Sequence, residues 1–184
     1  MTYFTDRNHP QVTELLKTGA VGVLRTDTLY GIVTSVFHEA AVERLYAVRG
    51  RERNKACILL ISDERDMFDI PPEQLREVLK TAWPGPVSVV VPAPSAPGYL
   101  PKVDGTLAYR LPADAELREL LRHTGPLLAP SANLAGQPPA KNIAAAKAYF
   151  GDKIDFYTDS GEVSDSAPSQ ILKLEPSGAV VRLR

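Results

Sequence analysis

Hydrophobic and polar residues follow two different spacings along this chain. Short continuous apolar runs, such as 56–61 and 87–91, are rich in β-branched residues, which is typical of buried strands. Other segments have helical spacing, and the first begins at Pro10 and is followed by Gly19, a usual helix start and stop. The spacings predict helices at 10–18, 39–48, 72–82, 114–123 and 140–150. They predict strands at 20–25, 32–36, 56–61, 87–91, 106–111, 127–129, 154–157, 170–174 and 179–183.

Helices and strands are mixed along the chain, which predicts an α/β fold with a mixed, largely buried β-sheet and flanking helices. The chain has 184 residues, a usual size for one domain, so we expect a single domain over residues 1–184. Hydrophobic residues make up 44% and charged residues 23%, which is close to globular averages and argues against disorder. The prolines cluster at 84–101 and 126–139, where they indicate stiff loops within the domain.

The charge balance limits the partners that the chain is expected to bind. Lysine and arginine number 21 against 22 acidic residues, which argues against a nucleic-acid coat but leaves room for a local basic cleft. No apolar run approaches the roughly 18 residues of a membrane span, and the first residues lack the apolar core of a signal peptide. The lone Cys57 excludes an internal disulfide. Together these features predict a cytoplasmic protein with no membrane partner.

Several common catalytic and cofactor motifs are absent from the sequence. It contains neither a G-x-S-x-G nucleophile elbow nor the phosphate loops G-x-x-x-x-G-K-[ST] and G-x-G-x-x-G. His9, His38 and His123 are scattered and lack metal-ligand spacing with Cys57. We therefore expect no metal site, surface or capping histidines, and a thiol buried in the core.

A cluster of cations follows the second predicted helix. Its members are Arg44, Arg49, Arg51, Arg53 and Lys55. A solvated charged surface is one interpretation. Helical spacing places Arg49 at the end of an apolar stripe, so it should point toward the sheet and need an anionic partner, whereas Arg44 should point away. If the chain after the helix is extended, the last three cations share a face, and two or three could converge on a polyanion such as triphosphate.

Hydroxyl and amide side chains stand beside several predicted strands. Thr26 and Thr28 lie between the strands 20–25 and 32–36, where they could bind a small polar ligand or form an ordinary turn. Ser131 and Asn133 follow a strand that proline ends, and ligands of open α/β sheets commonly lie beyond strand ends, although these residues could instead cap the next loop.

Two more polar residues accompany later strands. Arg110 lies inside the strand 106–111, and alternation leaves open whether it points inward or outward. Ser169 follows a hydroxyl-rich loop and immediately precedes the strand 170–174.

Six segments, in this order along the chain, resemble motifs of the YrdC-like family of threonylcarbamoyl-adenylate synthases. They read T-D-T-L-Y-G, V-R-G-R-E-R-N-K, W-P-G-P-V-S-V-V-V, L-A-Y-R-L-P, A-P-S-A-N-L-A-G and P-S-Q-I-L. Each segment alone is a weak signal, but six in register over residues 11–184 make the resemblance specific. Four positions depart from the family pattern: Arg25 and Ala56 replace prolines, Arg49 replaces a lysine and Gln170 replaces a threonine.

The resemblance implies a twisted α/β sheet around a cationic cavity and a nucleotidyltransferase reaction. L-Threonine, bicarbonate and ATP, with Mg²⁺ carried by the ATP, would give threonylcarbamoyl-AMP and pyrophosphate. The product would supply a separate tRNA threonylcarbamoyl-transferase complex that makes N6-threonylcarbamoyladenosine. The sequence leaves direct tRNA binding open and offers no obvious general base for the amine.

The resemblance also assigns residues to the two substrates. The threonine-side positions are Thr28, Arg110, Ser131 and Ser169. The ATP-side positions are Arg51, Lys55, Thr106, Asn133, Lys141 and Arg182. Arg49, at the motif lysine, and Arg51 are the expected catalytic residues, acting by positioning and charge.

Two other functions stay open. One is a module that binds structured RNA through the same basic cleft, although the net charge and the absence of an aromatic-studded basic strand argue against it. The other is a relative that activates a different carbamoyl group.

Overall fold

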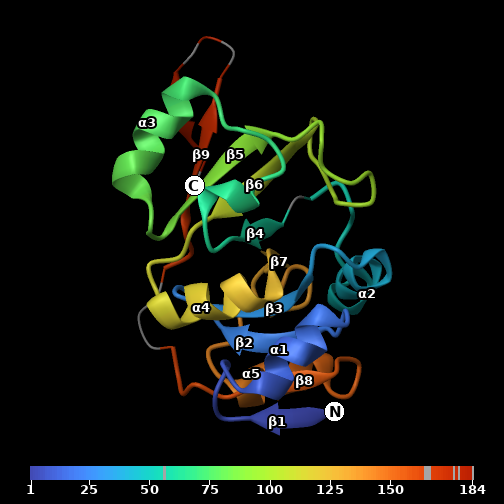
Figure 1. The fold of residues 1–184 in the computed structure, drawn as a ribbon. Helices are drawn as coiled ribbons and strands as arrows, with labels where there is room; N and C mark the ends of the chain where they lie inside the picture. The colour runs from blue at the N-terminus through green and yellow to red at the C-terminus, as the bar shows by residue number, and fades with distance from the viewer. Residues whose placement is uncertain (56, 164–166, 176, 178, 184) are drawn as a thin grey trace.

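The computed structural model describes residues 1–55, 57–163, 167–175, 177 and 179–183, and within them ten strands form one mixed sheet (Figure 1). Its strand order is β1-β8-β2-β3-β7-β4-β6-β5-β9-β10. The strands are β1 (Thr2–Phe4), β2 (Gly22–Arg25), β3 (Tyr30–Ser35), β4 (Ile58–Leu60), β5 (Val87–Pro92), β6 (Thr106–Arg110), β7 (Leu127–Leu128), β8 (Phe156–Thr158), β9 (Gln170–Leu174) and β10 (Val180–Arg182). The predicted α/β fold with a mixed sheet and flanking helices is confirmed.

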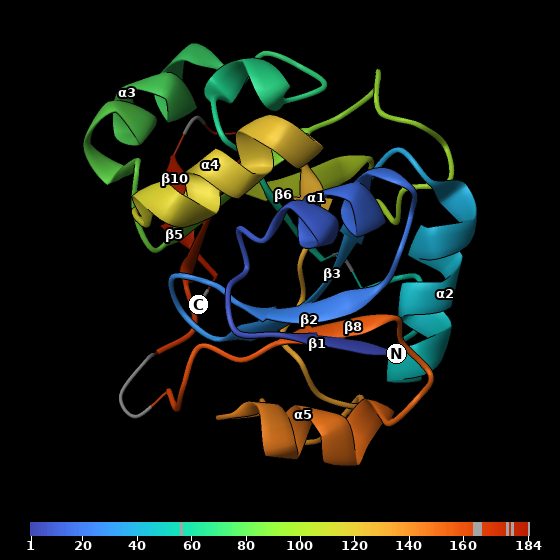
Figure 2. The same ribbon diagram turned by 60° about the horizontal axis from the view of Figure 1, so that its bottom comes forward.

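In the described part of the chain, five α-helices flank the sheet: α1 (Pro10–Lys17), α2 (Glu39–Arg49), α3 (Glu73–Ala82), α4 (Ala115–Thr124) and α5 (Ile143–Phe150). A short 3-10 helix, η1, spans Glu64–Asp66. Helices α1 and α4 lie together over one face of β1, β2 and β8, and α5 covers the other face (Figure 2). None of the helices in the described part of the chain is long and apolar enough to cross a membrane.

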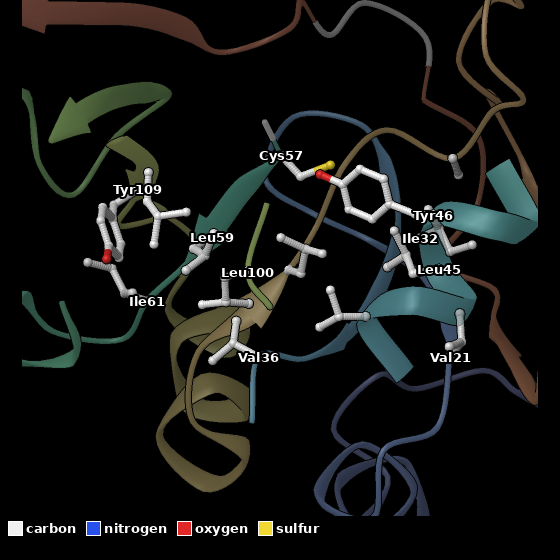
Figure 3. Close-up of a cluster of buried hydrophobic side chains, with 14 of the residues drawn as sticks. Val21, Ile32, Val36, Leu45, Tyr46, Cys57, Leu59, Ile61, Leu100 and Tyr109 are labelled. Atoms are coloured by element: carbon white, nitrogen blue, oxygen red, sulfur yellow. The ribbon is translucent and has the colours of Figure 1, made fainter. Parts of the chain in front are cut away.

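Hydrophobic core covers both faces of the sheet. Since successive strand residues point to opposite sides, each strand contributes side chains to both cores. Leu24 of β2 and Phe156 of β8 belong to the core beneath α1 and α4. Their neighbours Val23 and Tyr157 belong to a larger core on the other face. This larger core continues past β7 to Leu59 of β4 and joins the two halves of the sheet (Figure 3).

Local sequence signals explain where the helices begin and end. Asp114 caps α4, since its carboxylate accepts a 3.0 Å hydrogen bond from the backbone nitrogen of Leu117. Asn142 caps α5 in the same way, so that helix begins at Ile143 and the predicted start at residue 140 is wrong. Gly50 ends α2 with a φ of 59°, which a side chain would disfavour.

Two other differences from the predicted elements are informative. Strand β1 was not predicted, because it has three residues of which only Phe4 is buried, and its pairing with the distant β8 leaves no local signal. The chain from Arg51 to Lys55 is not extended: it turns, and the backbone nitrogen of Lys55 donates to the carbonyl of Glu52 at 3.2 Å. Ala56, the first residue of the predicted strand 56–61, lies outside the described residues.

Candidate functional site

A cavity of about 220 Å³ opens where several strand ends meet the end of α2. The predicted site residues that line it are Thr28, Arg49, Arg51, Arg110, Ser131 and Ser169. They come from the β2–β3 turn, the end of α2 and the residues after it, the end of β6, the loop after β7 and the residue before β9. The fold therefore brings side chains that are distant in sequence to one place.

The β2–β3 turn forms one wall through its threonines. The hydroxyl of Thr26 donates to the carbonyl of Leu29 at 2.7 Å and accepts from the backbone nitrogen of Leu29 at 3.2 Å. Thr28 is almost fully buried and its hydroxyl lies 3.3 Å from that of Thr26. Thr26 thus holds the turn closed, while both threonines present polar atoms at the cavity.

Arg110 enters the cavity from the end of β6, which settles the ambiguity of its strand position. Its side chain is 4% exposed, and its Nη2 lies 2.9 Å from Oδ1 of Asp27, whose side chain is 6% exposed. Burial raises the pKa of the Asp27 carboxyl, and the Arg110 charge opposes that rise. The two residues form a buried ion pair behind the threonine wall.

Arg49 is held by a different kind of partner. It is 2% exposed, as the apolar stripe predicts, but the expected anion is replaced by Asn133. Nε of Arg49 donates to the carbonyl oxygen of Asn133 at 3.0 Å, and Nη2 donates to its Oδ1 at 3.2 Å. Nη1 has no hydrogen-bond partner among the described residues. Burial lowers the pKa of this guanidinium, because the charged group loses its contact with water.

Ser131 and Asn133 lie on the same side of their loop and touch. The Ser131 hydroxyl donates to Oδ1 of Asn133 at 2.6 Å. The Asn133 amide donates to the carbonyls of Leu134 and Gln137 at 2.8 and 2.9 Å. Ser131 lines the cavity, whereas Asn133 lies behind it and joins Ser131 to Arg49.

Ser169 and Arg51 complete the polar lining. Ser169 is 2% exposed, and its hydroxyl lies 2.9 Å from that of Ser88 on β5. Arg51 is half-buried, and its Nε donates to the carbonyl of Lys55 at 3.2 Å. The turn after α2 therefore directs Arg51 into the cavity but not its neighbours.

Five predicted ATP-side residues do not line this cavity: Lys55, Thr106, Asn133, Lys141 and Arg182. Lys55 is exposed and pairs with Glu52 at 3.5 Å, because the turn replaces the extended chain that would have aligned it with Arg51. Thr106 donates to the carbonyl of Val103 at 2.6 Å, at the opposite end of β6 from Arg110. Lys141 and Arg182 are exposed.

The other two cations of the cluster also lie elsewhere. Arg53 pairs with Glu43 and also donates to a backbone carbonyl, so it does not converge on the cavity. Arg44 does not line the cavity; its side chain is 39% exposed and pairs with Asp155 at 2.6 Å.

Sequence reasoning missed two residues, one beside the cavity and one in its lining. Asp27 was overlooked as the partner of Arg110, although an acid between two threonines at a strand end was a usable signal. Cys57 belongs to the core, as expected, but its side chain also reaches the cavity, and Figure 3 shows the Tyr46 hydroxyl directed toward its sulfur. Burial raises the pKa of the Cys57 thiol, which argues against a nucleophilic role.

Comparison with known proteins places the chain in a family. The family model Sua5/YciO/YrdC, described as telomere recombination, matches residues 14–184. The chain belongs to the Sua5/YciO/YrdC family. A Mycobacterium tuberculosis protein (strain H37Rv), provisionally named threonylcarbamoyl-AMP synthase, is 35% identical over 172 residues, which cover 91% of this chain and 78% of the relative. A Pseudomonas entomophila threonylcarbamoyl-AMP synthase is 31% identical over 94% of this chain and 95% of its own length.

A solved structure gives the same picture. P. abyssi Sua5 in complex with L-threonine superimposes with a TM-score of 0.86 at 26% identity, and the match covers all of this chain. This chain spans 57% of that larger Sua5 chain, so the likeness concerns one part of it.

Proposed function

We propose that this protein is a threonylcarbamoyl-AMP synthase. The observation that carries the proposal is that two buried arginines line one cavity and have partners of different charge. Arg49 is held by an amide and a carbonyl, and Arg110 is paired with Asp27. Such a cavity suits two ligands at once, a polyphosphate and an amino acid, which are the substrates of this reaction.

The reaction balances as follows. The threonine amine and bicarbonate form a carbamate and release water. A carbamate oxygen then attacks the α-phosphate of ATP, forming an O–P bond as the bond to pyrophosphate breaks. Both reactants are anionic, so catalysis requires that cations hold them together and offset their repulsion.

We assign the two substrates to different walls of the cavity. Arg51 and Nη1 of Arg49 would hold the phosphates. The hydrogen bonds from Nε and Nη2 of Arg49 to Asn133 would keep the Arg49 guanidinium in place. Thr28, Arg110, Ser131 and Ser169 would hold threonine through its carboxylate, hydroxyl and amine. Lys55, Thr106, Lys141 and Arg182 would reach ATP only where it extends beyond the cavity.

Mg²⁺ would arrive with the ATP and stay on its phosphates. No group of three or more His, Cys, Asp or Glu side chains in the described part of the chain could hold a metal ion. We therefore assign the ion to the nucleotide and not to protein ligands. The product would pass to a tRNA threonylcarbamoyl-transferase complex, and the reaction would take place in the cytoplasm.

The direct test is to incubate the protein with ATP, Mg²⁺, L-threonine and bicarbonate and to detect threonylcarbamoyl-AMP by mass spectrometry. Omitting threonine or bicarbonate should abolish the product. Arg49→Ala should abolish most of it, while Arg44→Ala, a matched change on the outer face of the same helix, should not. Absence of product with folded protein, together with tight binding of structured RNA, would favour the RNA-binding alternative.

A further inference from the structure

The acidic residue of the β2–β3 turn does not line the cavity that its neighbours line. Thr26 and Thr28 are wall residues, whereas Asp27 between them lines a second, more open hollow that shares Thr26 with the cavity. From there the carboxylate of Asp27 pairs with Nη2 of Arg110, which does line the cavity. Asp27 therefore acts on the cavity through another residue.

The Arg110 guanidinium meets the β2–β3 turn through Nη2. Nη2 lies 2.9 Å from Asp27 Oδ1 and 3.5 Å from the hydroxyl oxygen of Thr26. The backbone of Arg110 is fixed as well, since its carbonyl accepts from Ile61 at 3.0 Å at the end of β6. With the backbone fixed and Nη2 paired, the planar guanidinium has fewer available orientations, which favours two-point recognition of a carboxylate.

The charges of this wall also match the ligand proposed for it. Arg110 and Asp27 together are neutral, and a free amino acid at neutral pH carries one carboxylate and one ammonium. A lone buried arginine would attract any anion, including the triphosphate meant for the other wall. The neutral Arg110–Asp27 pair is thus suited to an amino acid and not to a polyphosphate.

We infer that Asp27 is a positioning residue that orients Arg110 toward the carboxylate of the amino-acid substrate. This inference rests on the proposed function and adds a residue to it. Asp27 neither contacts the substrate nor moves a proton. Its loss should weaken recognition of threonine while leaving the phosphate wall, built on Arg49 and Arg51, intact.

The experiment measures the Michaelis constants for threonine and ATP in three variants of the full chain. In Asp27→Ala the constant for threonine should rise about tenfold or more, while that for ATP changes less than about twofold. Asp27→Glu retains the charge and should recover most of the threonine affinity. Asp155→Ala removes the partner of Arg44 away from the cavity, so it controls for the loss of an ion pair and should leave both constants unchanged.

A readout specific to the carboxylate sharpens the test. Wild-type protein should prefer threonine to threoninamide, and Asp27→Ala should lose most of that preference, which general destabilisation would not change. If Asp27→Ala does not fold, Arg110→Lys keeps a charge beside Asp27 but removes the planar fork, and it should show the same losses. A folded Asp27→Ala or Arg110→Lys protein with wild-type threonine affinity and preference would overturn the inference.

Failure of the proposed function would be visible separately, because wild-type protein would then form no threonylcarbamoyl-AMP. Calorimetric titration with threonine decides the inference in that case. Binding to wild type that is lost in Asp27→Ala supports the role of Asp27. No binding to wild type overturns both.

Discussion

Arg49 and Arg110 are both buried in walls of the same cavity, but their surroundings differ. Arg110 has a carboxylate partner in Asp27, so the pair is electrically neutral. Arg49 has two oxygens of one asparagine, so its full charge remains in the core. A buried charge without a counterion is costly, and an anionic ligand would relieve that cost. The comparison teaches that burial alone does not define an arginine's role: in the proposed function the charge of the partner separates Arg49, which would bind an anion, from Arg110, which would suit a zwitterion.

The largest expected effect is on stability and falls on the Arg110 side. Arg110→Ala leaves the Asp27 carboxylate buried without its partner, and we expect the free energy of unfolding to fall by about 3–5 kcal/mol. Arg49→Ala leaves only neutral acceptors on Asn133, and we expect a loss of about 1–3 kcal/mol. Urea denaturation of both variants measures the difference.

A second substitution makes that comparison specific. Adding Asp27→Asn to Arg110→Ala removes the stranded charge and should recover part of the lost stability. Equal losses in the two single variants, with no recovery in the double variant, would show that the charge of the partner does not matter.

The next effect is on turnover and falls on the Arg49 side. Arg49→Ala should lower the rate of product formation by about 10²–10³-fold, the usual cost of removing one preorganised donor. Arg49→Lys should retain more activity than Arg49→Ala, because Nη1 is the nitrogen left for the ligand and an ammonium also donates from a single nitrogen. Steady-state rates with saturating substrates test this, and equal activity of wild type and Arg49→Ala would assign the residue to structure alone.

Arg49 shows which structural features could be predicted from the sequence and which could not. Its inward direction followed from helical spacing, because α2 buries one face against the sheet. Its partner could not be predicted, since Asn133 is 84 residues away and reaches Arg49 only through the loop after β7. The order of helices and strands could be predicted because local spacing also shows which residues of each element are buried. The exception is β1, whose pairing with β8 is entirely long-range.

The turn after α2 shows where period-two reasoning failed. Alternation placed Arg51, Arg53 and Lys55 on one face, but the left-handed Gly50 and the turn that follows separate them. The signal was present in the helix-ending glycine, which often precedes a change of direction. Local turn geometry, rather than the cation count, decided that Arg51 alone of these three reaches the cavity.

That separation gives the third prediction. Arg51→Ala should weaken ATP binding by about 1–3 kcal/mol, the scale of a charge-assisted hydrogen bond. Lys55→Ala should change it by less than about 0.5 kcal/mol, as expected for an exposed residue paired within its own turn. Isothermal titration with ATP compares the two. A loss at Lys55 as large as that at Arg51 would mean that the turn rearranges when ATP binds.

The smallest expected effects concern Ser131 and Asn133, which lie where the threonine wall and the phosphate wall meet. Substituting each residue should affect a different substrate. Ser131 lines the cavity, and the proposed function assigns it to threonine, so Ser131→Ala should raise the threonine requirement by the equivalent of about 0.5–1.5 kcal/mol. Asn133 meets the cavity only through its neighbours, and Asn133→Ala releases Nη2 of Arg49, so its main effect should be on the ATP requirement. Titrating each substrate with the other saturating measures both shifts. Because Ser131 also donates to Asn133, a small ATP effect in Ser131→Ala is compatible with this division, but an ATP effect larger than its threonine effect would place Ser131 with the phosphate wall instead.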